Sequence, residues 1–414
     1  MLVFTWCLAL AAWCTAQAVS DAAPRVTLDS GIHEGLVRRS SNGNIVHQYL
    51  GIPFAASPTR FRPPEPVQTA VERRVLPAKY PPACVQATNS SGRESEDCLF
   101  LNIFVPEPGT RNDRAVMVFL YGGALQYGSA SLEMYDGTSF AANQDVVIVV
   151  PNYRTNVFGF PGVAPMIPVQ ERNLGFLDQR MAFNFVQRHI SKFGGDANKV
   201  TVFGQSAGAR SADFHLLTMK KPPFRAVIME SGSSELLPLA DRHRISRNTS
   251  HIPPLIRLAT SLSCTSPDTL IDCLRNVTAS KIKQAILEQH LYYPSTFDNN
   301  LTTVEDQLAT RRDGLAANVS LLMGSNSDEQ TMVLKEENHT SFDEYLNSTF
   351  YSSTRKKLKT HYAFGPNQTH ATEFDAMSAI ETDFSYTCLT SRESWISSLS
   401  RHRKWIQGVD LASS

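Results

Sequence analysis

The chain has 414 residues, 42% of them hydrophobic, which is enough for one large domain or two to three average ones with a sizeable core. Lys plus Arg and Asp plus Glu both number 39, so the formal net charge is zero. Such a chain has no basic field that would hold nucleic acid or an anionic membrane surface. We therefore expect a neutral substrate and no nucleic-acid partner.

The N-terminus predicts a secretory signal over residues 1–18. This apolar stretch is too short for a membrane-spanning helix and ends in Ala16-Gln17-Ala18. It lacks the usual positive charge near Met1, so a buried N-terminal helix is the alternative. No later apolar segment is long enough to span a bilayer. We expect the rest of the chain to be secreted and extracellular, without a membrane span.

Secretion exposes N-x-S/T sequences to glycosylation, and the chain contains eight of them. One, Asn318, stands directly before the apolar run VSLLMG, which favours a buried and unmodified side chain. We expect glycans on the other seven, Asn89, Asn248, Asn276, Asn300, Asn338, Asn347 and Asn367.

The secretory route also favours disulfides. Cys7 and Cys14 lie in the signal, and four of the remaining five cysteines fall into two close pairs. Of the three ways of joining four cysteines, we expect the two local bonds. Each would close a short loop and contribute about 2 to 4 kcal/mol. Cys388 has no obvious partner. The expected bonds are Cys84 with Cys98 and Cys264 with Cys273.

Five apolar runs predict buried strands along the chain. They are continuous and not alternating, which is typical of a sheet covered on both faces. Between the second and third runs, apolar residues recur at helical spacing from Asn173 until Gly194-Gly195 ends the helix. The runs are 116–120, 146–150, 200–203, 226–229 and 319–323.

The order of strand, helix and strand predicts an α/β fold of the doubly wound kind, with a mostly parallel sheet and helices on both faces. No repeat or low-complexity linker divides the chain. We therefore expect one domain over residues 19–414. Residues 235–318 are less periodic and predict a helical excursion over the sheet.

The third apolar run leads into VTVFGQSAGAR, which contains a G-x-S-x-G motif around Ser206. Chance produces this motif in roughly one chain of this length in ten, so its context decides. A strand before Gly204 and a helix after Ser206 would form the sharp turn of a nucleophile elbow. A β-carbon at position 204 or 208 would clash there, because strand and helix approach closely. Ser206 is the candidate nucleophile; an ordinary turn serine is the alternative.

Six segments carry a wider resemblance: SEDCLFLNIFVP at 95–106, VMVFLYGGALQYGS at 116–129, PNYRTNVFGF at 151–160, NLGFLDQR at 173–180, FGGDANKVTVFGQSAGA at 193–209 and GSNSDE at 324–329. From about Gly51 to Cys388 the chain resembles the type-B carboxylesterase and cholinesterase family of the α/β-hydrolase fold. The resemblance implies a serine carboxylic ester hydrolase that forms an acyl-enzyme with a small-molecule ester. We expect neither a metal nor another cofactor.

The resemblance also implies roles for individual residues. Ser206 would be the nucleophile and Glu329 the acid that orients a histidine; both follow strand ends, where open α/β sheets place their sites. The backbone N–H groups of Gly123, Ala124 and Ala207 would form the oxyanion hole. The alternatives are a surface carboxylate for Glu329 and a plain turn for the glycine pair.

Other reactive residue types in the matching segments are expected to be structural. The resemblance pairs Arg154 with Asp178 and Arg60 with Glu96 as ion pairs that hold the fold. Ser231, in the sequence MESGS, is expected to be a buried hydrogen-bonding serine and not a second nucleophile.

The chain departs from the family pattern at several positions. Ala124 replaces a glycine, Gln205 replaces a glutamate that often precedes the nucleophile, and Gln330 replaces a glycine. The catalytic histidine is expected far downstream of the acid, beside small residues, and no stretch fits. The histidines beyond Glu329 are His339, His361, His370 and His402.

The resemblance fades after about Cys388, so we expect the final strands, the last helix and the catalytic histidine to be absent. Without a base, a serine hydroxyl stays protonated and is a poor nucleophile. The alternatives to an active esterase are therefore a catalytically silent esterase-like binding or adhesion protein and an inactive truncated product. The polar segment between Cys84 and Cys98 favours soluble esters over an interfacial lipase.

Overall fold

The structure is a computed structural model. It describes residues 23–70, 75–88, 92–107, 112–235, 252–331, 334–335, 341–399 and 405–406. The predicted signal, three of the predicted glycosylation sites and two of the candidate histidines lie outside the described residues. These are residues 1–18, Asn89, Asn248, Asn338, His339 and His402.

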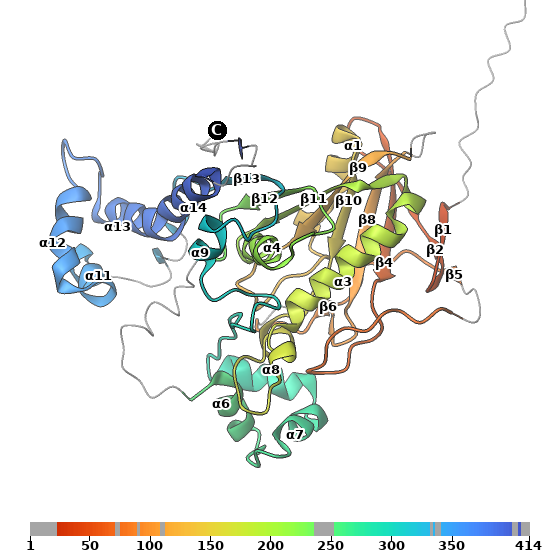
Figure 1. Cartoon of the computed structure of the whole chain (residues 1–414), viewed down its shortest axis with the longest axis horizontal. Coiled ribbons are helices and arrows are strands. Elements are labelled where there is room, and N and C mark those ends of the chain that lie inside the picture. Colours follow the sequence, from red (N-terminus) through yellow and green to blue (C-terminus); the bar gives the residue numbers. More distant parts are fainter. Residues whose placement is uncertain are drawn as a thin grey trace, which may run out of the picture.

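A nine-stranded sheet forms the centre of the described chain, in the order β14-β13-β12-β11-β9-β10-β8-β4-β3 (Figure 1). Strands β9 to β14 are parallel, whereas β8 pairs antiparallel with both β10 and β4. This mostly parallel sheet with helices around it confirms the α/β class. All five predicted runs are strands of it. The bounds are β3 (Leu36–Arg39), β4 (Ile45–Pro53), β8 (Phe100–Pro106), β9 (Arg114–Leu120), β10 (Val147–Pro151), β11 (Gly195–Gln205), β12 (Ala226–Glu230), β13 (Ser320–Gly324) and β14 (Trp405–Ile406).

Shorter strands, which the apolar pattern did not predict, lie outside the main sheet. One small sheet joins β1 (Arg25–Leu28), β2 (Gly31–Glu34) and β5 (Val75–Leu76), and another joins β6 (Ala83–Cys84) to β7 (Glu94–Ser95). Both expected disulfides form, Cys84–Cys98 and Cys264–Cys273. Cys388 is free and exposed.

The predicted helix before the third strand is α3 (Leu174–His189), which runs on into a single 3-10 turn over Ile190–Phe193. Gly194, at φ 77°, then ends it, as the sequence indicates. The other helices are α1 (Thr138–Gln144), α2 (Asn156–Gly159), α4 (Ala207–Thr218), α6 (Pro254–Ser261), α7 (Leu270–Asn276), α8 (Ala279–Glu288), α9 (Gln307–Arg312), α11 (Phe342–Thr349), α12 (Ser352–His361), α13 (Glu373–Thr382) and α14 (Cys388–Leu399).

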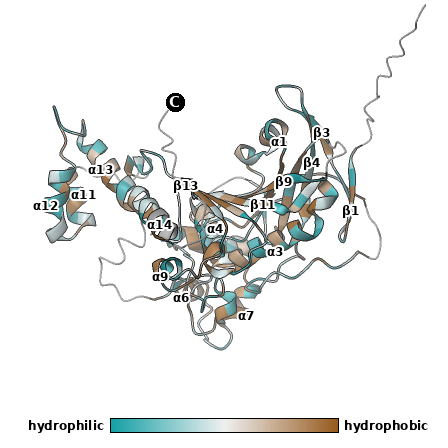
Figure 2. Cartoon of the chain, turned by 45° about the horizontal axis from the view of Figure 1, so that its top comes forward, coloured by the Kyte–Doolittle hydropathy of each residue, from teal (hydrophilic) through white to brown (hydrophobic). Residues whose placement is uncertain are grey.

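The sheet is not covered equally along its width. Strand β10 is buried throughout, and α3 and α4 cover one face of β11 and β12, where Val202 and Val227 are buried. On the opposite face Phe203 and Ile228 are only partly buried. Helices nevertheless lie on both faces, as expected: on this second face α1 contacts β4, β8 and β10, and its Phe140 ring lies 6.5 Å from the ring of Phe203. Figure 2 shows the hydrophobic character of β9 and β11.

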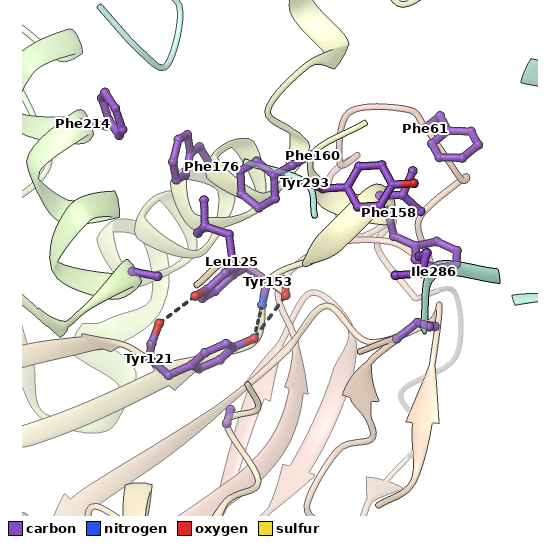
Figure 3. Packing of buried hydrophobic residues seen from close by; sticks show 14 of the residues in the cluster. Phe61, Tyr121, Leu125, Tyr153, Phe158, Phe160, Phe176, Phe214, Ile286 and Tyr293 are labelled. Carbon is purple, nitrogen blue, oxygen red and sulfur yellow. Dashed lines mark hydrogen bonds between the residues drawn. The ribbon is translucent and has the colours of Figure 1, made fainter. Parts of the chain in front are cut away.

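The predicted helical excursion is present as α6 to α9. It packs at the carboxyl ends of the strands, not flat across a sheet face. Its apolar side chains belong to the same core cluster as Leu125 and Phe158, which lie in the connections after β9 and β10. Figure 3 shows Ile286 and Tyr293 of this region near Phe158. The excursion thus adjoins the edge of the sheet where a site is expected.

Residues 341–382, here called the arm, form α11, α12 and α13 beyond β13 and α14 (Figure 1). The arm has a small core of its own, which includes Phe342, Tyr345, Leu346 and Ile380. Among the described residues no helix is long and apolar enough to cross a membrane.

The described glycosylation sequences all have exposed asparagines: Asn276, Asn300, Asn318, Asn347 and Asn367. The expectation that Asn318 is buried is wrong. It lies in the connection before β13, which begins only at Ser320, so the burial of the strand does not extend to it.

Candidate active site

Ser206 stands at the turn between β11 and α4 with φ 55° and ψ −120°. A positive φ is costly for a residue with a β-carbon and persists only where the surroundings enforce it. Here the Ser206 N–H donates to the carbonyl oxygen of Glu230 on the neighbouring strand, at 2.8 Å. The serine is thus fixed in a strained turn at the carboxyl edge of the sheet.

The glycines around the serine are required by close backbone approach. A β-carbon on Gly208 would lie 1.8 Å from the carbonyl oxygen of Leu120, and one on Gly204 would lie 2.6 Å from the carbonyl carbon of Gly208. Both contacts agree with the sequence argument. Gly232, which sequence reasoning missed, is similarly restricted, because its β-carbon would lie 2.4 Å from the backbone carbonyl oxygen of Ser206. Strand, helix and following loop are therefore pressed together at Ser206.

Residues 121–128, here called the glycine loop, lie against the serine. A β-carbon on Gly122 would be 3.1 Å from the Ser206 Cβ. The Gly123 carbonyl accepts hydrogen bonds from the N–H groups of Gln126, at 2.8 Å, and Tyr127, at 3.2 Å. In a trans peptide the next N–H points opposite to the carbonyl, so the Ala124 N–H is directed away from these two donors.

Two N–H groups of this loop, those of Gly123 and Ala124, remain open for a ligand. No hydrogen bond to another described residue occupies the N–H of Gly123 or Ala124. Ala207 is the first residue of α4, where N–H groups lack intrahelical partners and the helix dipole favours negative charge. The structure thus places Gly122 against Ser206, with Gly123 and Ala124 following it in the glycine loop and Ala207 following the serine in the chain.

A tyrosine pair that sequence reasoning missed joins the first residue of the glycine loop, Tyr121, to Tyr153 (Figure 3). The Tyr153 hydroxyl donates to the Tyr121 carbonyl oxygen at 2.7 Å, and the Tyr121 hydroxyl donates to the Tyr153 carbonyl oxygen at 3.2 Å. Their rings stack at 4.4 Å. Burial raises the pKa of both phenols well above the ordinary value, so both remain donors. This reciprocal pair fixes the backbone directly before Gly122.

The two expected ion pairs form. Arg154 Nη2 lies 2.7 Å from Asp178 Oδ1 with both side chains buried, and Arg60 Nε lies 2.8 Å from Glu96 Oε2. Ser231 is buried, and its N–H donates to the Gly324 carbonyl oxygen at 2.8 Å. These contacts fit the structural roles predicted for them.

Glu329 lies in the loop after β13. Its Oε1 accepts from the Asn326 N–H at 2.7 Å, and its own N–H donates to Thr382 Oγ1 at 3.1 Å. Among the described residues, no histidine is hydrogen-bonded to it. The described histidines downstream, His361 and His370, instead lie beside the ring of Tyr362, at 4.9 and 5.8 Å.

A cavity of about 320 Å³ lies beside the acid loop, between residues 324–327 and the helical segment that runs from α13 into α14. Thr382, Asp383, Thr387 and Thr390 are among the residues that line it. Leu322 pairs in parallel with Ile406 of β14, so this short strand points to the same edge of the sheet. No group of three or more potential metal ligands is present in the described part of the chain.

Comparison with known proteins gives the family. The model of the carboxylesterase family matches residues 22–400. Acetylcholinesterase of Bungarus fasciatus is 37% identical over 66% of this chain and 46% of its own length. Acetylcholinesterase of Electrophorus electricus is 36% identical over 69% of this chain and 48% of its own length.

A bacterial relative is comparably similar. Para-nitrobenzyl esterase of Bacillus subtilis is 33% identical over 70% of this chain and 61% of its own length. The chain thus spans about half the length of the curated relatives it matches. With the family match over most of its residues, the chain belongs to the carboxylesterase family.

Proposed function

We propose that this protein is a carboxylic ester hydrolase with Ser206 as its nucleophile. The observation that carries the proposal is the strained turn at Ser206, with the glycine loop against the serine Cβ. This arrangement presents a hydroxyl and open N–H groups at one point, which is what acyl transfer needs.

In the proposed reaction the Ser206 Oγ attacks the ester carbonyl carbon while a base takes the hydroxyl proton. The former carbonyl oxygen becomes negative and is stabilised by the N–H groups of Gly123, Ala124 and Ala207. Collapse of this intermediate expels the alcohol, which takes up a proton, and leaves the acyl group on Oγ. Water then attacks the acyl-enzyme and releases the carboxylic acid.

Glu329 is proposed as the acid that orients the base. We infer that the base approaches from the side of the cavity beside residues 324–327, since β14 points to this edge. His361 and His370 are poor candidates, because they contact Tyr362 in the arm. The helix that ends at His361, α12, lies far from α4 in Figure 1.

We propose a secreted glycoprotein that acts on small, neutral, soluble esters. The exposed asparagines of the described sequons and the two disulfides support the secretory route. The zero net charge supports a neutral substrate.

A second candidate is a catalytically silent binding protein on the same fold. One observation favours it: Glu329 is hydrogen-bonded to Asn326 and Thr382, and no described histidine is bonded to it. Such a protein would keep the glycine loop but would not activate Ser206.

A fluorophosphonate separates the two candidates. The purified chain and its Ser206→Ala variant would be treated in parallel, with circular dichroism to show that both are folded. A covalent mass increase confined to the wild type supports the esterase. A folded wild type that stays unlabelled contradicts it and supports the silent binding protein.

A further inference from the structure

The glycine loop contains two successive strained residues, and one buried side chain is bonded to the backbone around them. Ala124 has φ 53° and Leu125 has φ 62°, both in the left-handed region that residues with a β-carbon disfavour. Such strain persists only where neighbouring contacts hold it. Gln126, which follows directly, is buried at 7% exposure.

The amide of Gln126 joins this loop to the segment after α8. Its Nε2 donates to the Tyr293 carbonyl oxygen at 2.8 Å, and its Oε1 accepts from the Tyr293 N–H at 3.2 Å. The side chain therefore pairs with the Tyr293 backbone much as a neighbouring strand would. Tyr293 is itself buried at 1% exposure, so this anchor is fixed in the core.

The same amide also acts on the strained loop. Nε2 is 3.2 Å from the Ala124 carbonyl oxygen, which additionally accepts from the Tyr292 hydroxyl at 3.4 Å. The peptide planes on both sides of Ala124 are thus fixed, because the Gly123 carbonyl is held by the Gln126 and Tyr127 N–H groups. The Ala124 N–H lies in the plane of the Gly123 carbonyl, and the bond from the Gln126 side chain to the Ala124 carbonyl restrains the next plane, so that Ala124 is held at its strained φ between the two.

We propose that Gln126 is a positioning residue for the oxyanion hole, through which the segment after α8 sets the direction of the Ala124 N–H. The inference rests on the proposed function, because it assigns a role to a group that the esterase reaction would use. Preorganised N–H donors are effective only at the geometry of the developing charge, and a displacement of about 1 Å costs up to about 100-fold in rate.

The test uses Gln126→Met, which keeps the size of the side chain and removes its hydrogen bonds. Gln187→Met is the matched control, since Gln187 Nε2 also donates to two backbone carbonyls, those of Ala197 at 2.8 Å and Pro223 at 2.9 Å. The rate of fluorophosphonate labelling, the melting temperature and hydrogen exchange of residues 121–128 are measured for both variants.

We expect Gln126→Met to label about 10 to 100 times more slowly than wild type, with Gln187→Met close to wild type and similar melting temperatures for the two variants. If Gln126 only stabilised the fold, as Gln187 does, labelling would be slowed equally in both variants or in neither. Labelling of Gln126→Met within about twofold of wild type would overturn the proposal.

If the wild type is not labelled, the proposed function fails and hydrogen exchange decides the inference. Faster exchange of the glycine loop in Gln126→Met, but not in Gln187→Met, would support positioning by Gln126. Unchanged exchange in both variants would overturn it.

Discussion

The two sides of the candidate site are built differently. On the nucleophile side, the glycine loop and residues 204–208 are held by backbone contacts so close that no β-carbon fits at Gly204 or Gly208. On the acid side, Glu329 is held by one hydrogen bond to its carboxylate and one to its N–H, and the arm beyond it has a separate small core. The nucleophile side is therefore set by the sheet and its own backbone contacts, whereas the acid side is also bonded to the arm, through Thr382.

The largest expected effect comes from closing the narrowest contact on the nucleophile side. Gly208→Ala would place a methyl group 1.8 Å from the Leu120 oxygen, so helix and strand must separate. We expect a loss of more than about 4 kcal/mol of stability, measured by denaturant unfolding. The control is Gly92→Ala, where the added carbon meets no atom within 4 Å and stability should stay within about 0.5 kcal/mol. Equal stability of the two variants would contradict the close packing.

A somewhat smaller effect is expected from the buried ion pair beneath the same side. Asp178→Asn leaves the Arg154 guanidinium buried without its counter-charge, which costs about 3 to 5 kcal/mol. The exposed pair of Arg25 and Glu34 offers a control, because Glu34→Gln should change stability by at most about 1 kcal/mol. Chemical denaturation compares them, and a small effect of Asp178→Asn would show that the pair does not hold the site.

The independence of the nucleophile side from the arm can be tested with a cavity inside the arm. Leu346, fully buried, lies in the arm, and Leu346→Ala should destabilise the arm by about 2 to 5 kcal/mol. Hydrogen exchange should rise within residues 341–382, while Ser206 labelling stays at the wild-type rate. Leu216→Ala, the same change on α4, should instead lower global stability. Slower labelling in Leu346→Ala would break the proposed independence.

The weakest expected effect is a dependence of stability on pH, which arises where α9 contacts α14 and α4. Arg311, Asp213 and Glu393 are fully buried, and Arg311 pairs with both carboxylates. Burial raises the pKa of Glu393 to about 7 from an ordinary 4.5, with Asp213 adding to the rise and Arg311 opposing it. Since the folded state holds this proton more tightly than the unfolded state, the contribution of Glu393 to stability is fully present below pH 4.5 and is lost as pH rises towards 7.

Glu393→Gln removes the titrating group, so the fall in melting temperature between about pH 5 and pH 8 should become smaller than in wild type. Glu34→Gln is the control, because its partner Arg25 and the exposed pair they form lie outside this cluster. If the melting temperature of Glu393→Gln falls with pH as steeply as that of wild type, the carboxyl of Glu393 is not the source of the pH dependence.

Much of the fold could be predicted because it depends on neighbours in the chain. Continuous apolar runs located the parallel strands, and the spacing of cysteines located both disulfides. Burial was predicted less well. The partly exposed Phe203 and Ile228 depend on which helix lies over which strand, and no local pattern reports that.

The sequence by itself determined the elbow at Ser206, since a strand, a tight turn and a helix are encoded within ten consecutive residues, TVFGQSAGAR. Only the tertiary structure decided what supports it. Gln126 and Tyr293 are 167 residues apart, and Tyr121 and Tyr153 are 32 apart. Such pairs meet only after the sheet has assembled, because their hydrogen bonds satisfy backbone groups that the fold itself buries.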